Sequence, residues 1–340
     1  MQVKIRKYKM KRIMNPARIL ALGFFIIIVL GTLLLMLPIS QKTGANIKFI
    51  DALFTATSAV CVTGLSTFDP ATYLSVFGQT VLGILIQLGG LGFACISIGI
   101  VMVTGQKVFL KQQTLVKEAL NFNSYDNILS LVKSVIFTTL IIEGTGTVLN
   151  FTIFIKDYSF PKALGLSIFH AVSSFNNAGF DILGKGNNLM SYQGNIALTL
   201  VTSFMIILGG IGYLVIKEVL TKRNYKKLSL HTKVVLWMTA LLLVLGTVIF
   251  MLTEKYSLLD AFFMSTSTRT AGFTTVDLGN ISNAGLAVYM ALMFIGASPT
   301  STGGGIKTTT FFVVIAALCS YSSSKTPTVF KKTLAKDILY

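Results

Sequence analysis

Three segments of the sequence share a spacing that could bind a cation through backbone carbonyl groups. Each has a Phe followed ten residues later by a Gly, with Ser or Thr four residues after the Phe: Phe54, Ser58 and Gly64; Phe169, Ser173 and Gly179; Phe262, Thr266 and Gly272. Glycine permits a positive φ, so a turn there can point successive carbonyl groups into a narrow lumen. A ring of such carbonyl groups can replace the hydration shell of a cation.

The elements that must position these segments are predicted from their length. About ten helical residues rise roughly 15 Å, which is half the hydrocarbon thickness, so each segment can reach the membrane midplane but must turn back. A second motif follows in two of the repeats, Leu88-Gly-Gly-Leu-Gly-Phe93 and Leu208-Gly-Gly-Ile-Gly-Tyr213. Such regular self-similarity indicates a repeat architecture. Each repeat is predicted as a helix, a re-entrant pore helix, a filter loop and a second helix.

Composition places these repeats in a membrane. Hydrophobic residues make up 53% of the chain and charged residues only 12%, whereas a soluble domain carries about 25% charged residues. Uninterrupted apolar stretches cover residues 19–37, 76–103, 128–155, 196–216 and 234–252, and a sixth, 284–320, is interrupted. The predicted fold class is an all-α polytopic membrane protein with parallel repeats around a pseudo-fourfold pore, of which three repeats are present.

The net charge of +17 is distributed unevenly along the chain. Most Lys and Arg residues lie in the amino terminus, in the segments 105–133 and 217–233, and in the tail after 324. The positive-inside rule therefore predicts a multi-pass protein of the plasma membrane with a cytoplasmic amino terminus. These basic runs lack interleaved aromatic residues that could stack on bases, so nucleic acid is excluded as a partner.

The charge map and the repeats together predict the organisation of the chain. The predicted units are a basic cytoplasmic amino terminus (1–18), a first pore repeat (19–104), a cytoplasmic loop (105–127), a second pore repeat (128–217), a cytoplasmic loop (218–233), a third pore repeat (234–322) and a basic cytoplasmic tail (323–340) that begins a missing fourth repeat. No fourth pore helix or filter glycine follows Tyr321. We therefore expect either a fragment or a pore completed by a separate partner.

These motifs resemble the Trk/Ktr/HKT superfamily of potassium transporters, most closely the Ktr-type membrane subunit, over the whole chain. The resemblance implies that potassium is the transported ion, with no cofactor in this chain and no metal beyond potassium. It implies three filter segments, whose backbone would bind potassium: Val62, Thr63 and Gly64; Asn177, Ala178 and Gly179; Thr270, Ala271 and Gly272. In this family a glycine at the position of Gly64 accompanies potassium selectivity, and a serine accompanies sodium.

A run of small and hydroxyl residues interrupts the sixth apolar stretch. The resemblance implies an intramembrane gate loop at 296–310, with candidate residues Gly296, Ser298, Pro299, Thr300, Ser301, Thr302, Gly303, Gly304, Gly305 and Lys307. Three consecutive glycines can absorb large changes in φ and ψ, and hydroxyl groups can satisfy freed backbone groups. The alternative, a cytoplasmic linker, is disfavoured because residues 284–295 are too few to cross the membrane alone. Lys307 either points into the lumen and repels cations or extends toward the cytoplasm.

Two further charges lie within the membrane. Arg269 is placed at the carboxyl end of the third pore helix, where it can interact with unsatisfied carbonyl groups or act directly on permeation. Glu143 is the one acidic residue deep in an apolar stretch, which marks it as a functional candidate. Its side chain either hydrogen-bonds locally to Thr or backbone, in a helix packed through Gly144 and Gly146, or pairs with Lys307 or Arg269.

The resemblance also implies partners and leaves alternatives open. The implied assembly is a homodimer in the lipid bilayer, resting on an octameric ring of cytosolic nucleotide-binding regulatory subunits, with 105–127 and 217–233 as docking surfaces. An enzyme is not expected, because no nucleophile with a base and no cluster of metal ligands is evident. An ion-coupled secondary symporter and a non-conducting truncated fragment remain alternatives to a gated potassium uptake path.

Overall fold

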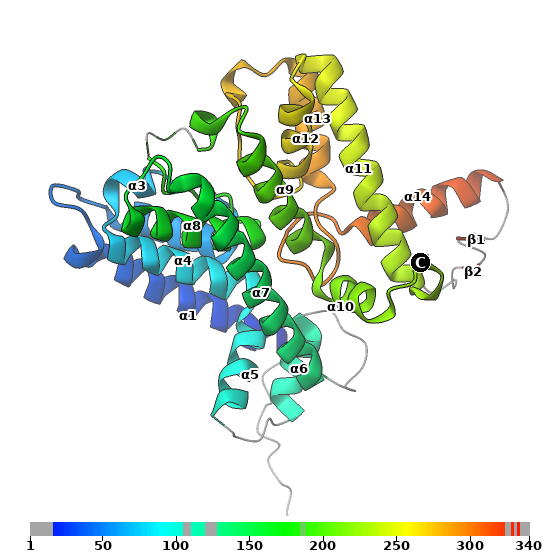
Figure 1. Cartoon of the computed structure of the whole chain (residues 1–340). Helices are drawn as coiled ribbons and strands as arrows, with labels where there is room; N and C mark the ends of the chain where they lie inside the picture. The colour runs from blue at the N-terminus through cyan, green and yellow to red at the C-terminus, as the bar shows by residue number, and fades with distance from the viewer. Residues whose placement is uncertain are drawn as a thin grey trace, which may run out of the picture.

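A computed structural model describes residues 16–104, 110–119, 128–184, 186, 188–323, 328–329 and 332–333. Figure 1 shows α1, α4, α7 and α8 side by side in one half of the molecule, and α9, α11, α12 and α13 together in the other. The regular secondary structure of the described residues is helical, apart from one short pair of strands. The predicted amino-terminal unit lies outside the described residues up to residue 15, as do most of the loop 105–127 and most of the tail after 323.

A long helix, a shorter helix and then a divided second helix follow one another three times. The first set is α1 (Pro16–Met36), η1 (Pro38–Ser40), α2 (Phe49–Val60), α3 (Pro70–Tyr73), α4 (Val76–Leu91) and α5 (Phe93–Val103), followed by α6 (Leu110–Ala119). The second is α7 (Ile128–Phe154), α8 (Phe160–Phe175), η2 (Met190–Tyr192), α9 (Ile196–Ile211) and α10 (Tyr213–Lys222), followed by η3 (Tyr225–Lys227). The third is α11 (Leu230–Glu254), α12 (Leu258–Ser267), η4 (Leu278–Asn280), α13 (Asn283–Phe294) and α14 (Thr308–Ser323), followed by the antiparallel pair β1 (Thr328–Val329) and β2 (Lys332–Thr333).

Each set begins with a long helix that packs against the short helix after it, so that α1 contacts α2, α7 contacts α8 and α11 contacts α12. Among the described residues, α1, α7 and α11 are long and apolar enough to cross a membrane. Their outer faces carry exposed side chains such as Phe25, Phe137 and Trp237. A helix surface of this kind suits contact with lipid rather than water.

The second helices of the first two repeats are broken, which corrects the prediction of uninterrupted spans at 76–103 and 196–216. The chain bends by 100° between α4 and α5 and by 96° between α9 and α10. The bends lie at Gly92 (φ 77°) and Gly212 (φ 96°), the third glycine of each repeated motif. A positive φ ends the helical hydrogen-bond pattern, and glycine adopts it without a steric penalty.

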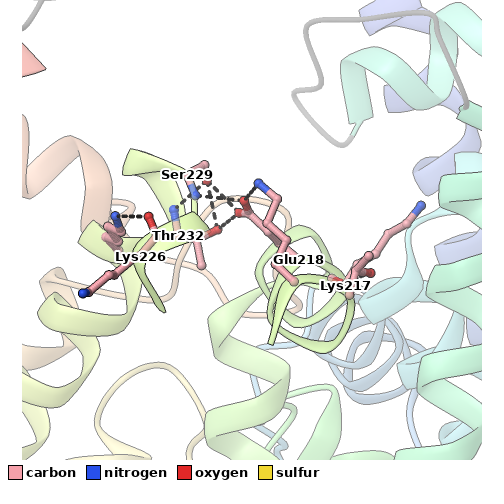
Figure 2. Close-up of polar contacts among 8 residues, drawn as sticks. Lys217, Glu218, Lys226, Ser229 and Thr232 are labelled. Carbon is pink, nitrogen blue, oxygen red and sulfur yellow. Dashed lines mark hydrogen bonds and ion pairs between the residues drawn. The ribbon is translucent and has the colours of Figure 1, made fainter. Parts of the chain in front are cut away.

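A carboxylate fixes the turn between the second and third repeats. Figure 2 shows Glu218 of α10 facing the first turn of α11. The Ser229 N–H donates to Glu218 Oε1 at 2.8 Å and the Ser229 hydroxyl donates to Oε2 at 2.7 Å, while Thr232 also donates to Oε2. Lys222 Nζ lies 2.6 Å from Oε1. The Glu218 carboxylate thus accepts hydrogen bonds from groups at the amino-terminal end of α11 that have no partner inside the helix. These bonds fix the conformation of the segment 217–233.

Candidate functional site

The three predicted filter segments follow the carboxyl ends of α2, α8 and α12 and share one backbone conformation. The residue at the first position of each segment has a positive φ: Val62 (55°), Asn177 (56°) and Thr270 (69°). So does the glycine at the third position: Gly64 (84°), Gly179 (71°) and Gly272 (83°). A positive φ is uncommon for any non-glycine residue and most unusual for a β-branched one. The same pair of positive φ values thus recurs at the three positions that the sequence analysis aligned.

Hydrogen bonds to a serine hold each turn against the end of its short helix. The Thr63 N–H donates to the Ser58 carbonyl at 2.8 Å, and the Ala178 N–H donates to the Ser173 carbonyl at 2.8 Å. In the third repeat the Ala271 N–H donates to the Ser267 carbonyl at 2.9 Å. These bonds satisfy carbonyl groups that the helix end would otherwise leave unpaired.

The third repeat departs by one residue from the predicted equivalence. The Ser173 hydroxyl donates to the Phe180 carbonyl at 2.7 Å, and the Ser267 hydroxyl donates to the Phe273 carbonyl. Thr266, the predicted counterpart of Ser173, instead donates to the Phe262 carbonyl within its own helix at 2.9 Å. The spacing from Phe to Gly concealed this shift because α12 ends five residues before Gly272, whereas α8 ends four residues before Gly179.

The filter glycines bring neighbouring segments into backbone contact. A Cβ atom at Gly64 would overlap with the Ala178 carbonyl oxygen, and one at Gly179 would lie 2.5 Å from the Ala271 carbonyl oxygen. The segments therefore meet in the order first, second, third around a shared centre. Only glycine allows the backbones to approach this closely.

The predicted gate loop folds into a hairpin against this centre. The Ala297 N–H donates to the Gly304 carbonyl at 3.0 Å, which closes the loop. The Gly304 N–H donates to Thr270 Oγ1 at 3.1 Å, and the Thr302 hydroxyl donates to the Phe175 carbonyl at 3.0 Å. The loop thus contacts the third filter segment and the end of the second short helix.

The predicted gate loop packs against the bend between α9 and α10. The Ser298 N–H donates to the Gly210 carbonyl at 2.9 Å, the Thr302 N–H to the Gly209 carbonyl at 3.2 Å, and the Tyr213 N–H to the Thr300 carbonyl at 3.0 Å. Sequence reasoning used the Gly-Gly motif only to set the register and missed this contact. The signal was nevertheless present, because adjacent glycines at a helix end leave carbonyl groups accessible to another segment.

The two predicted intramembrane cations contact the loop. Lys307 Nζ donates to the Gly303 carbonyl at 2.8 Å, an arrangement that neither predicted orientation described. The Arg269 side chain is 6% exposed and donates from Nη2 to the Gly296 carbonyl at 3.4 Å. Within the described residues neither cation forms a salt bridge. Both cations therefore contact the base of the hairpin, where residues 296–297 pair with residues 304–306.

Glu143 contacts the second pore helix, and neither predicted type of partner is correct. Asn176 Nδ2 donates to Glu143 Oε1 at 3.0 Å and to Gln87 Oε1 at 2.9 Å. Glu143 is 8% exposed and Asn176 is fully buried. Because Asn176 directly follows α8 and directly precedes Asn177, this cluster links α4 and α7 to the second predicted filter segment. The adjacent asparagines at a pore-helix end were the sequence signal.

An acidic residue, Asp181, lies two positions after the second predicted filter segment. Asp181 accepts a hydrogen bond from the Leu183 N–H at 3.1 Å. Burial raises the pKa of Asp181 to about 6, opposed by the hydrogen bond from Leu183 and supported by the negative charge of Asp69. A carboxyl group here adds negative potential next to the filter at neutral pH and loses it as the pH falls through 6.

Comparison with known proteins gives a consistent result. The family model described as TrkH, cation transport protein, matches residues 3–257 and 228–340. The chain is 40% identical to the potassium/sodium uptake protein NtpJ of Enterococcus hirae, over 95% of this chain and 73% of that protein. It is also 40% identical to the Ktr system potassium uptake protein B of Bacillus subtilis, over 96% of this chain and 75% of that protein.

The fold has a solved counterpart. The potassium transporter TrkH from Vibrio parahaemolyticus superposes with a TM-score of 0.69 at 19% identity, over 98% of this chain and 69% of that structure. This likeness and the helical composition confirm the predicted fold class.

The contacts of Glu143 give a prediction that separates the contribution of its charge to stability from that of its hydrogen bond. Glu143→Leu removes one of three acceptors around Asn176 Nδ2, the others being Gln87 Oε1 and the Val172 carbonyl. It should lower the free energy of unfolding by about 0.5–1.5 kcal/mol, the net contribution of one hydrogen bond. Glu143→Gln keeps an acceptor oxygen and should cost less than half of that loss. Thermal unfolding of the two purified variants measures the difference. Equal destabilisation by both would show that the negative charge, rather than the hydrogen bond, stabilises the cluster.

Proposed function

This chain belongs to the family of TrkH cation transport proteins, and we propose that it takes up potassium across the plasma membrane along a path lined by the carbonyl groups of its filter segments. The observation that carries the proposal is the backbone conformation repeated at 62–64, 177–179 and 270–272. Alternating positive φ values orient successive carbonyl groups, and carbonyl oxygens replace water around a potassium ion.

The short helices contribute to this site electrostatically. α2, α8 and α12 all direct their carboxyl ends at the filter segments. The negative end of each helix dipole lowers the energy of a cation at that position. The ion thus exchanges its hydration shell for fixed dipoles, and it can leave again because no full negative charge binds it tightly.

The loop at 296–310 acts as the gate in this proposal. Its contacts to Thr270 and Phe175 place it against the filter segments, and its glycines allow it to change conformation. The main-chain bonds to Gly209 and Gly210 couple the loop to the bend between α9 and α10. Movement of α10 would therefore be transmitted to the loop.

Regulation through a cytosolic partner fits this coupling. Two relatives, from Bacillus subtilis and Vibrio alginolyticus, carry the name Ktr system potassium uptake protein B, which describes one component of a system. We propose a homodimer that rests on a ring of nucleotide-binding regulatory subunits and contacts it through the basic segments 105–127 and 217–233. The Glu218 cluster fixes the geometry of the second segment, so that a force on it reaches α10.

Replacement of a filter glycine tests the path. Gly64→Ser should lower the potassium-to-sodium uptake ratio by about tenfold or more, because the new side chain overlaps with the Ala178 carbonyl group and displaces it. The measurement is ion uptake by a transporter that contains these three repeats and a fourth filter segment. Gly44→Ser is the control, since Gly44 has a similar φ of 85° but nothing near its Cβ position. An unchanged ratio in the Gly64 variant would remove this residue from the filter.

Substitutions of two neighbouring hydroxyl residues, Ser301 and Thr302, test the proposed gate. Thr302→Val removes the bond to Phe175 and should raise potassium flux, and deletion of Pro299–Gly305 should raise it further. Ser301→Ala should leave flux unchanged, because the Ser301 hydroxyl bonds only to Ser298 inside the loop. Flux is measured in the same transporter. If the deletion leaves flux and its regulation as they were, the loop is a linker and not a gate.

The orientation in the membrane is tested by labelling. Cysteines that replace Lys42 and Lys222 should react with an impermeant thiol reagent from opposite faces, since the positive-inside rule places residue 42 outside and residue 222 in the cytoplasm. The background should carry alanine at the native positions Cys61, Cys95 and Cys319. Labelling of both positions from one side of intact cells would contradict the proposed topology.

A further inference from the structure

A cavity of about 950 Å³ lies between the first two repeats, bounded by α4 and α8 and reached by α7. It extends from Lys42 and Lys162 at one end to Gln87 and Glu143 at the other. It is separate from the filter segments, none of whose residues lines it. Nothing in the proposed transport path requires a space at this position.

The walls of the cavity are apolar and face the membrane side of the molecule. α4 contributes Gly83 and Ile84, and α8 contributes Gly165, Ile168 and Phe169. Ile84 and Ile168 are 53% and 48% exposed, which suits contact with a hydrocarbon chain. No other atom lies within 4 Å of the Cβ position at Gly165, so this glycine leaves part of the space open.

The end of the cavity at the start of α8 is positively charged. Lys42 donates to the Ala71 carbonyl, and Lys162 Nζ lies 4.5 Å from the centre of the Tyr158 ring. Both side chains are exposed, and in the described part of the chain neither forms a salt bridge. The amino-terminal end of the α8 dipole adds positive potential here. Two lysine side chains without a salt-bridge partner favour the binding of an anionic group.

The opposite end of the cavity presents few unpaired polar groups. Gln87 Oε1 and Glu143 Oε1 each accept a hydrogen bond from Asn176 Nδ2, which pairs these two oxygens from the protein side. An apolar chain can therefore end at this position at little cost in unpaired hydrogen bonds. The cavity thus has a basic end near the membrane surface and an apolar body that points to the membrane centre.

We propose that this cavity binds one anionic phospholipid, with its phosphate group at Lys42 and Lys162 and one acyl chain between α4 and α8. In the proposed topology the lipid comes from the outer leaflet. The combination of an apolar channel with two cations at one end matches a lipid, whereas a partner helix would not need the charges. An occupied cavity excludes water from the Glu143–Asn176 bond behind the filter.

The test is native mass spectrometry of the purified full chain in detergent, titrated with dioleoyl phosphatidylglycerol or with dioleoyl phosphatidylcholine. One phosphatidylglycerol should be retained, with clear preference over phosphatidylcholine. The double variant Lys42→Ala, Lys162→Ala should bind phosphatidylglycerol about 30-fold more weakly, from the attraction expected of two surface cations. The double variant Lys48→Ala, Lys156→Ala is the control, because these exposed lysines do not line the cavity.

A second variant fills the space without changing charge. Gly165→Leu should abolish retention of both lipids, whereas Gly144→Leu on α7, which also enters open space but lies outside the cavity, should not. Unchanged thermal unfolding without added lipid shows that both variants fold.

Equal retention of the two lipids, or lipid binding that survives Gly165→Leu, would overturn the proposal. A change in the number of chains per particle in the Gly165→Leu spectrum would also overturn it, because a second copy of the chain would then cover the cavity. Lipid retention is measured without ion flux, so its failure leaves the transport proposal intact.

Discussion

Backbone polar groups that end inside a membrane must find partners within the protein, and this requirement governs the structure. Three short helices stop at the depth where the chain turns back, and each leaves carbonyl groups without a helical partner. Some of these groups accept bonds from the turn itself, as Ser58 does from Thr63 and Ser173 from Ala178. In the proposed path, an ion is the partner of filter carbonyl groups that the protein leaves unpaired, whereas the Gly179 carbonyl accepts from Asn188 Nδ2.

The same requirement explains why the loop of the third repeat lies where it does. An irregular segment of this length within the membrane needs donors and acceptors along its whole course. The Gly209 carbonyl at the end of α9 accepts from the Thr302 N–H, and the Gly210 carbonyl accepts from the Ser298 N–H. In turn, the Thr300 carbonyl of the loop accepts from the Tyr213 N–H, the first of α10. The bend of one repeat and the loop of the next thus satisfy each other, so neither can move alone without loss of hydrogen bonds.

Much of this could be predicted from the sequence because the controlling features are local. Glycine at a fixed distance from a phenylalanine indicated Gly64, Gly179 and Gly272, and apolar length indicated α1, α7 and α11. The contacts of Glu143 could not be predicted, because Asn176 and Gln87 come from elements that only tertiary packing brings together. The role of Ser267 was missed for another reason: a one-residue change in the length of a helix leaves the spacing of its flanking motifs intact. The bends at Gly92 and Gly212 were missed because hydropathy averages over them.

The first glycine of each Gly-Gly pair has one role in two repeats. A Cβ atom at Gly89 would overlap with the carbonyl oxygen of Val60, the last residue of α2, and one at Gly209 would overlap with that of Phe175, the last residue of α8. In both repeats the second helix therefore contacts the end of the pore helix directly. The repeats diverge just beyond this contact: nothing lies within 4 Å of the Cβ position at Gly92, whereas the Pro299 carbonyl occupies it at Gly212. Among the described residues, the equivalent bends of the two repeats therefore differ, because the loop packs against Gly212 while the position at Gly92 stays open.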